Sequence, residues 1–205
     1  MKPTPPTRKQ GLGWLTDLVS NLTGYAAIRV PLQRASRPRE VTLNLPGYWQ
    51  IDSYSCGGIA AAMVVQCLRP QVSFQRVHSA VAPLPETGAG TTRVTRALRS
   101  LGIGVACRPD LTFDTICDAI DAGRPVVACV TTADPCTDHW VVLYGYGRRP
   151  NLVFVARQGF PFLAKHRTPW REFRREWSLR GLGLVCWKAL DRERGRPSHS
   201  PKEKK

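Results

Sequence analysis

Hydrophobic and polar positions change their period about halfway along the chain. In the first half, the longest apolar run is SCGGIAAAMVVQCL, which begins at Ser55 and has no turn residue after Gly58. This alanine-rich run predicts a buried helix. Two amphipathic patterns predict further helices over 91–101 and 112–122, each followed by a glycine, with a short strand over 103–107 between them.

In the second half, compact runs of β-branched and aromatic residues are separated by turn signals, and they predict strands. These runs lie at 125–130, 139–144, 152–156 and 183–189. A helical pattern at 170–177 precedes the last strand, and the N-terminal part adds a helix at 14–22 and a strand at 39–45. Helices that come first and strands that come later favour the α+β class.

The length of 205 residues suits one domain with a sizeable core. A hydrophobic fraction of 42% and six tryptophans also indicate a packed chain. The proline-rich segment 1–10 and the polar, basic segment 191–205 predict disordered tails. We therefore expect a single domain over 11–190.

The formal net charge of +15 is distributed unevenly. Between Arg148 and Arg180, nine Lys and Arg face only Glu172 and Glu176. Such a surface attracts nucleic acid, anionic membranes or acidic peptides, although a solvated basic face is the simpler interpretation. No recognisable nucleic-acid motif lies among these arginines, so no specific nucleic-acid partner is predicted.

The seven cysteines form neither a disulfide framework nor a zinc ribbon, because their number is odd and no Cys-x-x-Cys pair occurs. Cys136 and His139 have a Cys-x-x-His spacing, but no second ligand pair accompanies them, so we predict no metal and no other cofactor. No apolar stretch is long enough for a signal peptide or a membrane span. Reduced thiols in the cytoplasm are the simplest expectation.

The segment from Gln50 to Gly58 carries candidate chemistry. Cys56 falls in the first turn of the predicted buried helix, where the macrodipole favours a thiolate. Gly57 and Gly58 would let a substrate backbone approach the sulfur. Attack on a carbonyl creates an oxyanion, for which the backbone N–H of Cys56 and the side-chain amide of Gln50, six residues upstream, are candidate donors.

His139 is the candidate base, because it begins a predicted strand that can present an imidazole to the start of the cysteine helix. Asp138 cannot easily support the ring, since adjacent strand residues point to opposite faces. Trp140 is expected in the core. Other interpretations stay open: Cys56 as an inert buried thiol, His139 as a core histidine and Gln50 as a surface residue.

The sequence resembles the papain-like cysteine peptidases of the bacteriocin-processing, double-glycine-leader type, including their stand-alone members. The matching text covers roughly 45–190: the Gln50-to-Cys56 spacing, SCGGIAAAMVV, GRPVVACV, DHWVVLYGYG and the supportive closing segment WREFRREWSLRGLGLVCW. The resemblance implies a papain-like α+β fold, in which a helical half led by the Cys56 helix packs on a mostly antiparallel sheet.

The resemblance also implies a mechanism and partners. Cys56 would be the nucleophile of a peptidase that forms a thioester, His139 the base and then the acid, and Gln50 the oxyanion donor. The substrate would be a peptide cut after a Gly-Gly leader. Family members are often fused to a membrane transporter, and a chain without one could serve a separate transporter.

One departure from the family pattern concerns the end of the strand that follows the histidine strand. The family has an acidic residue and a proline there, whereas this chain has Arg157, Gln158 and Gly159. Without the carboxylate the imidazolium is less stable, and Arg157 would repel it. Gln158 could orient the ring through its amide oxygen. The alternatives are an impaired scaffold that binds leader-like peptides and a basic polyanion-binding protein.

Overall fold

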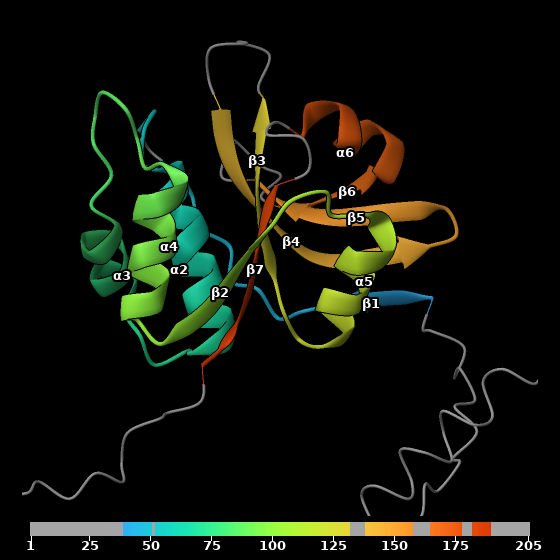
Figure 1. The fold of residues 1–205 in the computed structure, drawn as a ribbon, viewed down its shortest axis with the longest axis horizontal. Coiled ribbons are helices and arrows are strands. Elements are labelled where there is room, and N and C mark those ends of the chain that lie inside the picture. Colours follow the sequence, from blue (N-terminus) through green and yellow to red (C-terminus); the bar gives the residue numbers. More distant parts are fainter. Residues whose placement is uncertain (1–38, 51, 132–137, 158–164, 178–181, 190–205) are drawn as a thin grey trace, which may run out of the picture. The chain divides into compact units, whose positions relative to one another are not determined.

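The computed structural model describes residues 39–50, 52–131, 138–157, 165–177 and 182–189 (Figure 1). The predicted helix at 14–22, the two predicted tails and Gln158 lie outside these ranges. A domain over 11–190 therefore stays a prediction.

A seven-stranded sheet forms the centre of the described chain. Its order is β2-β7-β3-β4-β5-β6, with β1 pairing to β4, and each of these pairings is antiparallel. The strands are β1 (Glu40–Thr42), β2 (Ile103–Arg108), β3 (Val126–Thr131), β4 (Asp138–Arg148), β5 (Asn151–Ala156), β6 (Lys165–Pro169) and β7 (Gly183–Lys188). The prediction of a mostly antiparallel sheet is confirmed.

Helices cover both faces of this sheet (Figure 1). One group is α2 (Cys56–Leu68), α3 (Phe74–Val81) and α4 (Thr91–Ser100), and the other is α5 (Phe113–Asp121) and α6 (Trp170–Glu176). Alternation along β4 separates two cores. Trp140 and Val142 pack with the α2 group, whereas Val141 and Leu143 pack with α5 and α6. The α+β class predicted from the sequence is confirmed.

Helix α2 is the central helix of the first core. All of its residues from Cys56 to Val65 are buried, and the small side chains of Ala60, Ala61 and Ala62 are 0% exposed. A helix that is apolar all round is packed on every side, here by α3, α4 and the sheet. The core therefore holds α2 firmly and fixes the position of Cys56 at its first residue.

Two elements were missed by the sequence patterns. Helix α3 has Phe74, Val77 and Val81 at helical spacing after the N-cap Ser73, a short pattern that the sequence analysis did not use. Strand β6 (Lys165–Pro169) has no aliphatic or aromatic residue and lies at the sheet edge, where polar residues and proline are normal. Neither segment could form on local preference, because each depends on the neighbour against which it packs.

Candidate active site

The turn before α2 is organised by Asp52, a residue that the sequence analysis did not single out. Its Oδ1 accepts hydrogen bonds from the backbone N–H groups of Tyr54 at 2.9 Å and Ser55 at 2.7 Å. Burial acts to raise the pKa of Asp52, but hydrogen bonds from the Ser55 side chain, these N–H groups and the Gln50 side chain hold it below 3.8. An aspartate three residues before the N-cap of a helix is the available sequence signal for such a turn.

This turn places Cys56 against the backbone of β4. The Cys56 side chain is 7% exposed, and its sulfur lies within hydrogen-bonding reach of the backbone N–H of Trp140. Trp140 directly follows His139 on the strand. The structure therefore brings the predicted nucleophile to the strand segment that carries the predicted base.

The electrostatics of Cys56 differ from the sequence expectation. Burial raises the pKa of the thiol above 9.0, and the negative charge of Asp52 raises it further. Hydrogen bonds from the backbone of Trp140, Gly57 and Cys56 itself act in the opposite direction but do not outweigh burial. Desolvation thus acts against the thiolate that the start of the helix was expected to favour. A proton acceptor has to be supplied from elsewhere.

The two glycines after Cys56 are closely packed, and their predicted part in the approach of a substrate backbone stays a prediction. A Cβ added at Gly57 would lie 3.0 Å from Cβ of Ala89 and 3.1 Å from Cδ1 of Trp140, and one at Gly58 would lie 3.0 Å from Cδ2 of His78. Trp140 is a core residue, as expected: it is 7% exposed, and its indole N–H donates to the Ala89 carbonyl at 2.7 Å.

His139 is the second residue of β4 and is partly buried. It pairs with Val130 of β3. Asp138, the first residue of the strand, is exposed and by alternation points to the opposite face. The strand start that was predicted to carry the base is therefore present, and it lies beside the sulfur of Cys56.

Gln50 lies just upstream of the Asp52 turn and is partly buried. Its Oε1 is buried and has no hydrogen-bond partner among the described residues. The Gln50 side chain also donates a hydrogen bond to Asp52 in the turn before α2. The preceding Trp49 has a side chain that is 54% exposed. The amide of Gln50 is thus on the α2 side of the candidate site.

The residue after β5 is Arg157, and its guanidinium forms an ion pair with the carboxylate of Glu176 at the end of α6. The Arg157 side chain is 27% exposed and the Glu176 side chain is 42% exposed. The sequence analysis placed Glu176 only within a charge run. Gln158, the predicted substitute for the acidic residue, lies outside the described residues.

Within the described ranges, no three His, Cys, Asp or Glu side chains gather so as to hold a metal ion. No helix within these ranges is both long and apolar enough to cross a membrane.

The cysteine at the start of a buried helix, the strand that begins beside it with a histidine, and the helix-on-sheet layers define a papain-like cysteine peptidase fold. Within this class, the chain belongs to the Peptidase_C39 like family, whose sequence profile matches residues 42–182. The family prediction made from the sequence is confirmed. A comparison with curated proteins found no match.

Solved structures agree with this assignment. A double glycine motif protease from an AMS/PCAT transporter, in complex with the leader peptide, is 17% identical with a TM-score of 0.54, and the match covers 71% of this chain and 93% of that one. The peptidase domain of Streptococcus ComA, a bi-functional ABC transporter involved in a quorum-sensing pathway, is 21% identical with a TM-score of 0.56. This match covers 68% of this chain and 96% of that domain. A Carica candamarcensis cysteine protease is 15% identical with a TM-score of 0.55, and the match covers 75% of this chain and 100% of that one.

Proposed function

We propose that this chain is an active cysteine peptidase, in which Cys56 attacks the peptide carbonyl and His139 moves the proton. The observation that carries the proposal is the position of the Cys56 sulfur against the backbone of Trp140, one residue from His139. Gln50, whose side chain donates to Asp52 in the turn before α2, is the proposed side-chain donor to the oxyanion.

The mechanism follows from the burial of the thiol. Because burial raises the pKa of Cys56, the thiol keeps its proton unless His139 accepts it. The sulfur then bonds to the carbonyl carbon, and the amide of Gln50 and the backbone N–H of Cys56 hold the oxyanion. His139 returns the proton to the departing amine as the C–N bond breaks, and water hydrolyses the thioester.

The proposed substrate is a peptide cut after a Gly-Gly leader. Two of the similar structures are transporter peptidases, and one of them was solved with its leader peptide bound. Family membership supports a peptide as substrate. A separate membrane transporter as partner is part of this proposal, and so is a cytoplasmic site of action.

A peptide electrophile that ends in Gly-Gly tests the proposal directly. The label should form on Cys56 and should be absent from Cys56→Ala and His139→Ala. Cys67→Ala is the matched control, because Cys67 is a second thiol on α2, partly buried at the far end of the helix, and should not matter. Labelling at an unchanged rate in His139→Ala would contradict a Cys–His pair. Binding of leader peptide without labelling would indicate the impaired scaffold instead.

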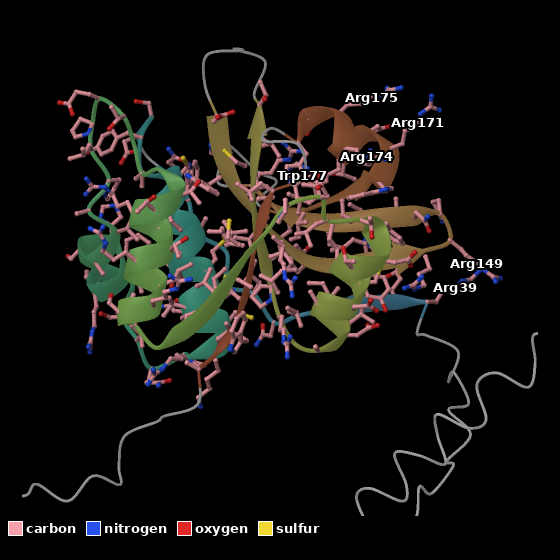
Figure 2. The ribbon with its side chains drawn as sticks, viewed as in Figure 1. Arg39, Arg149, Arg171, Arg174, Arg175 and Trp177 are labelled. Atoms are coloured by element: carbon pink, nitrogen blue, oxygen red, sulfur yellow. The ribbon has the colours of Figure 1, made fainter. Side chains whose placement is uncertain are left out.

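An exposed basic surface favours a second candidate function, the binding of polyanions. Figure 2 shows Arg171, Arg174 and Arg175 projecting outward from α6, with Arg39 and Arg149 on the same side of the view. All five side chains are exposed. If this surface binds polyanions, retention on a heparin resin should fall steeply with salt and should weaken when the three α6 arginines are changed to glutamine. Retention that is insensitive to salt would end this second candidate.

A further inference from the structure

The carboxylate of Asp52 is the common acceptor of the segment that runs from Gln50 to Cys56. Its Oδ1 accepts hydrogen bonds from the backbone N–H groups of Tyr54 at 2.9 Å and Ser55 at 2.7 Å. The side chains of Ser55 and Gln50 also donate to this carboxylate. An ionised carboxylate offers about four acceptor positions, so this set of donors matches its full capacity.

One part of this network fixes the start of α2. Ser55 is the N-cap of α2 and is 2% exposed, but its side chain does not accept a hydrogen bond from the first turn of the described helix. The hydroxyl donates to Asp52 instead. The next residue is Cys56, whose backbone N–H is one of the proposed oxyanion donors. Asp52 therefore helps to set the position of that N–H through the N-cap.

The other part of the network orients the amide of Gln50. An ionised carboxylate only accepts hydrogen bonds, so the Gln50 side chain has to turn its NH2 group toward Asp52. Its Oε1 then takes the other branch of the amide, where it is buried and has no partner among the described residues. The NH2 group carries two hydrogens, and Asp52 accepts one of them. The second hydrogen remains for an oxyanion.

The same carboxylate acts against the thiolate of Cys56. Burial is the main reason that the pKa of Cys56 is raised, and the negative charge of Asp52 adds to it. An asparagine could accept the backbone N–H groups of such a turn without this disadvantage. It could not offer a second acceptor oxygen to the side chains of Gln50 and Ser55. The carboxylate is therefore explained by those side-chain donors rather than by the turn alone.

The histidine that packs on α2 does not share the place of Asp52. His78 of α3 lies against Gly58, since a Cβ added there would come 3.0 Å from Cδ2 of the imidazole. Helix residues two positions apart do not face each other, so His78 and the Cys56 side chain lie on different sides of α2. Among the described residues, Asp52 has the largest charge effect on the Cys56 thiol.

We infer that Asp52 is a positioning residue of the proposed active site, which holds both oxyanion donors in one arrangement by accepting from Gln50 and from the start of α2. The inference rests on the proposed function, in which the amide of Gln50 and the backbone N–H of Cys56 hold the oxyanion. Donors that are already in place stabilise a transition state without reorganisation. Asp52 acts through these donors and not on the substrate.

Asp52→Asn separates this role from a merely structural one, because its two expected effects have opposite signs. The asparagine oxygen keeps the two N–H groups of the turn but has no lone pair left for Gln50. For a Gly-Gly peptide, kcat/KM should fall about three- to fivefold, mainly through kcat, because a hydrogen bond that positions a donor is lost. Alkylation of Cys56 by iodoacetamide at pH 8 should rise about twofold, because a negative charge near the thiol is removed. Mass spectrometry of the peptide that contains Cys56 measures this rate in the full chain.

A double variant shows whether Asp52 acts through Gln50. In a Gln50→Ala background, adding Asp52→Asn should lower kcat/KM by less than about twofold, whereas alkylation should still rise. Asp110→Asn is the matched control, because Asp110 is an exposed aspartate just after β2 and the change removes the same charge. It should alter neither rate.

An unchanged or raised kcat/KM in Asp52→Asn would overturn the inference, and so would a further loss of the same size in the Gln50→Ala background. Parallel falls in turnover and alkylation would indicate a disturbed helix start and would also overturn it. If Asp52→Asn does not fold, Asp52→Ser decides by the same two rates, because its hydroxyl keeps an acceptor for the turn. If the unchanged protein cuts no Gly-Gly peptide, the proposed function fails and the role of Asp52 fails with it. Normal turnover in Asp52→Asn rejects the role of Asp52 alone.

Discussion

The two sides of the candidate site are embedded differently in the molecule. On one side, Cys56 begins a helix whose first ten residues are all buried, and the Asp52 turn fixes its start. On the other side, Arg157 follows the last residue of β5 and is joined to α6 by an ion pair that is partly exposed. Close packing restricts which substitutions are tolerated around Cys56, whereas a strand end near the surface tolerates more of them.

The two sides also differ in how closely they follow the family pattern. The α2 side keeps the spacing of Gln50 and Cys56 that the family resemblance rests on. The β5 side departs from the family pattern, because Arg157 and Gln158 follow the strand, and Arg157 is paired with Glu176. We expect substitutions on the α2 side to have the larger effects.

The largest effect is expected from Gln50→Ala. If the Gln50 amide holds the oxyanion, its removal should lower kcat/KM for a Gly-Gly peptide by about 100- to 1000-fold. Gln71→Ala is a matched control, since Gln71 is an exposed glutamine after α2 and should leave the rate unchanged. Peptide hydrolysis followed by mass spectrometry measures both. An unchanged rate in Gln50→Ala would remove Gln50 from the mechanism.

The next largest effect is on the free energy of unfolding, and it also concerns the α2 side. Gly57→Ala places a Cβ against Ala89 and Trp140 in a closely packed core, so it should lower the free energy of unfolding by about 1–3 kcal/mol. Gly90→Ala is the control, because a Cβ there meets nothing within 4 Å. Urea unfolding of the two variants gives the difference. Equal stability would show that the contact at Gly57 relaxes without loss.

On the β5 side, Gln158→Ala tests whether this amide orients His139. We expect turnover to fall about tenfold, because a group that orients a catalytic imidazole usually contributes on this order. Gln158→Asp should preserve or raise turnover, since it restores the acidic residue of the family pattern. Steady-state kinetics of the two variants are compared at neutral pH. Turnover unaffected by alanine would assign the orientation of His139 to another group.

The smallest effect is expected from Asp52→Asn and depends on pH. The pKa of Asp52 is lower in the folded protein than in an unfolded chain, so its charge stabilises the fold above about pH 4, the unfolded value, and this contribution is lost as the pH falls through the folded pKa. Urea unfolding should therefore show Asp52→Asn as less stable at pH 6, by less than about 1 kcal/mol because the group is partly exposed, and nearly equal near pH 3. A difference that grows on acidification would contradict this sign.

Much of the fold could be predicted from the sequence because most elements carry their own pattern. The α2 run, the amphipathic helices α4 and α5 and the apolar strands β3, β4 and β5 all lie close to their expected positions. The segment of β6 was missed because an edge strand without apolar positions gives no periodic signal, whereas α3 was missed although Phe74, Val77 and Val81 have helical spacing. Both segments pack against elements that lie outside their own stretch of sequence.

For the site, the sequence determined the residue types: a cysteine at a helix start, a glutamine six residues before it and a histidine at a strand start. Only the tertiary structure decided that the sulfur meets β4 beside His139, that Gly57 and Gly58 are needed for packing, and that burial raises the pKa of Cys56. It also joined Arg157 to Glu176, which lies nineteen residues later. Local preferences predict where elements begin, whereas burial and charge pairing depend on segments that meet only when the sheet and its helices have assembled.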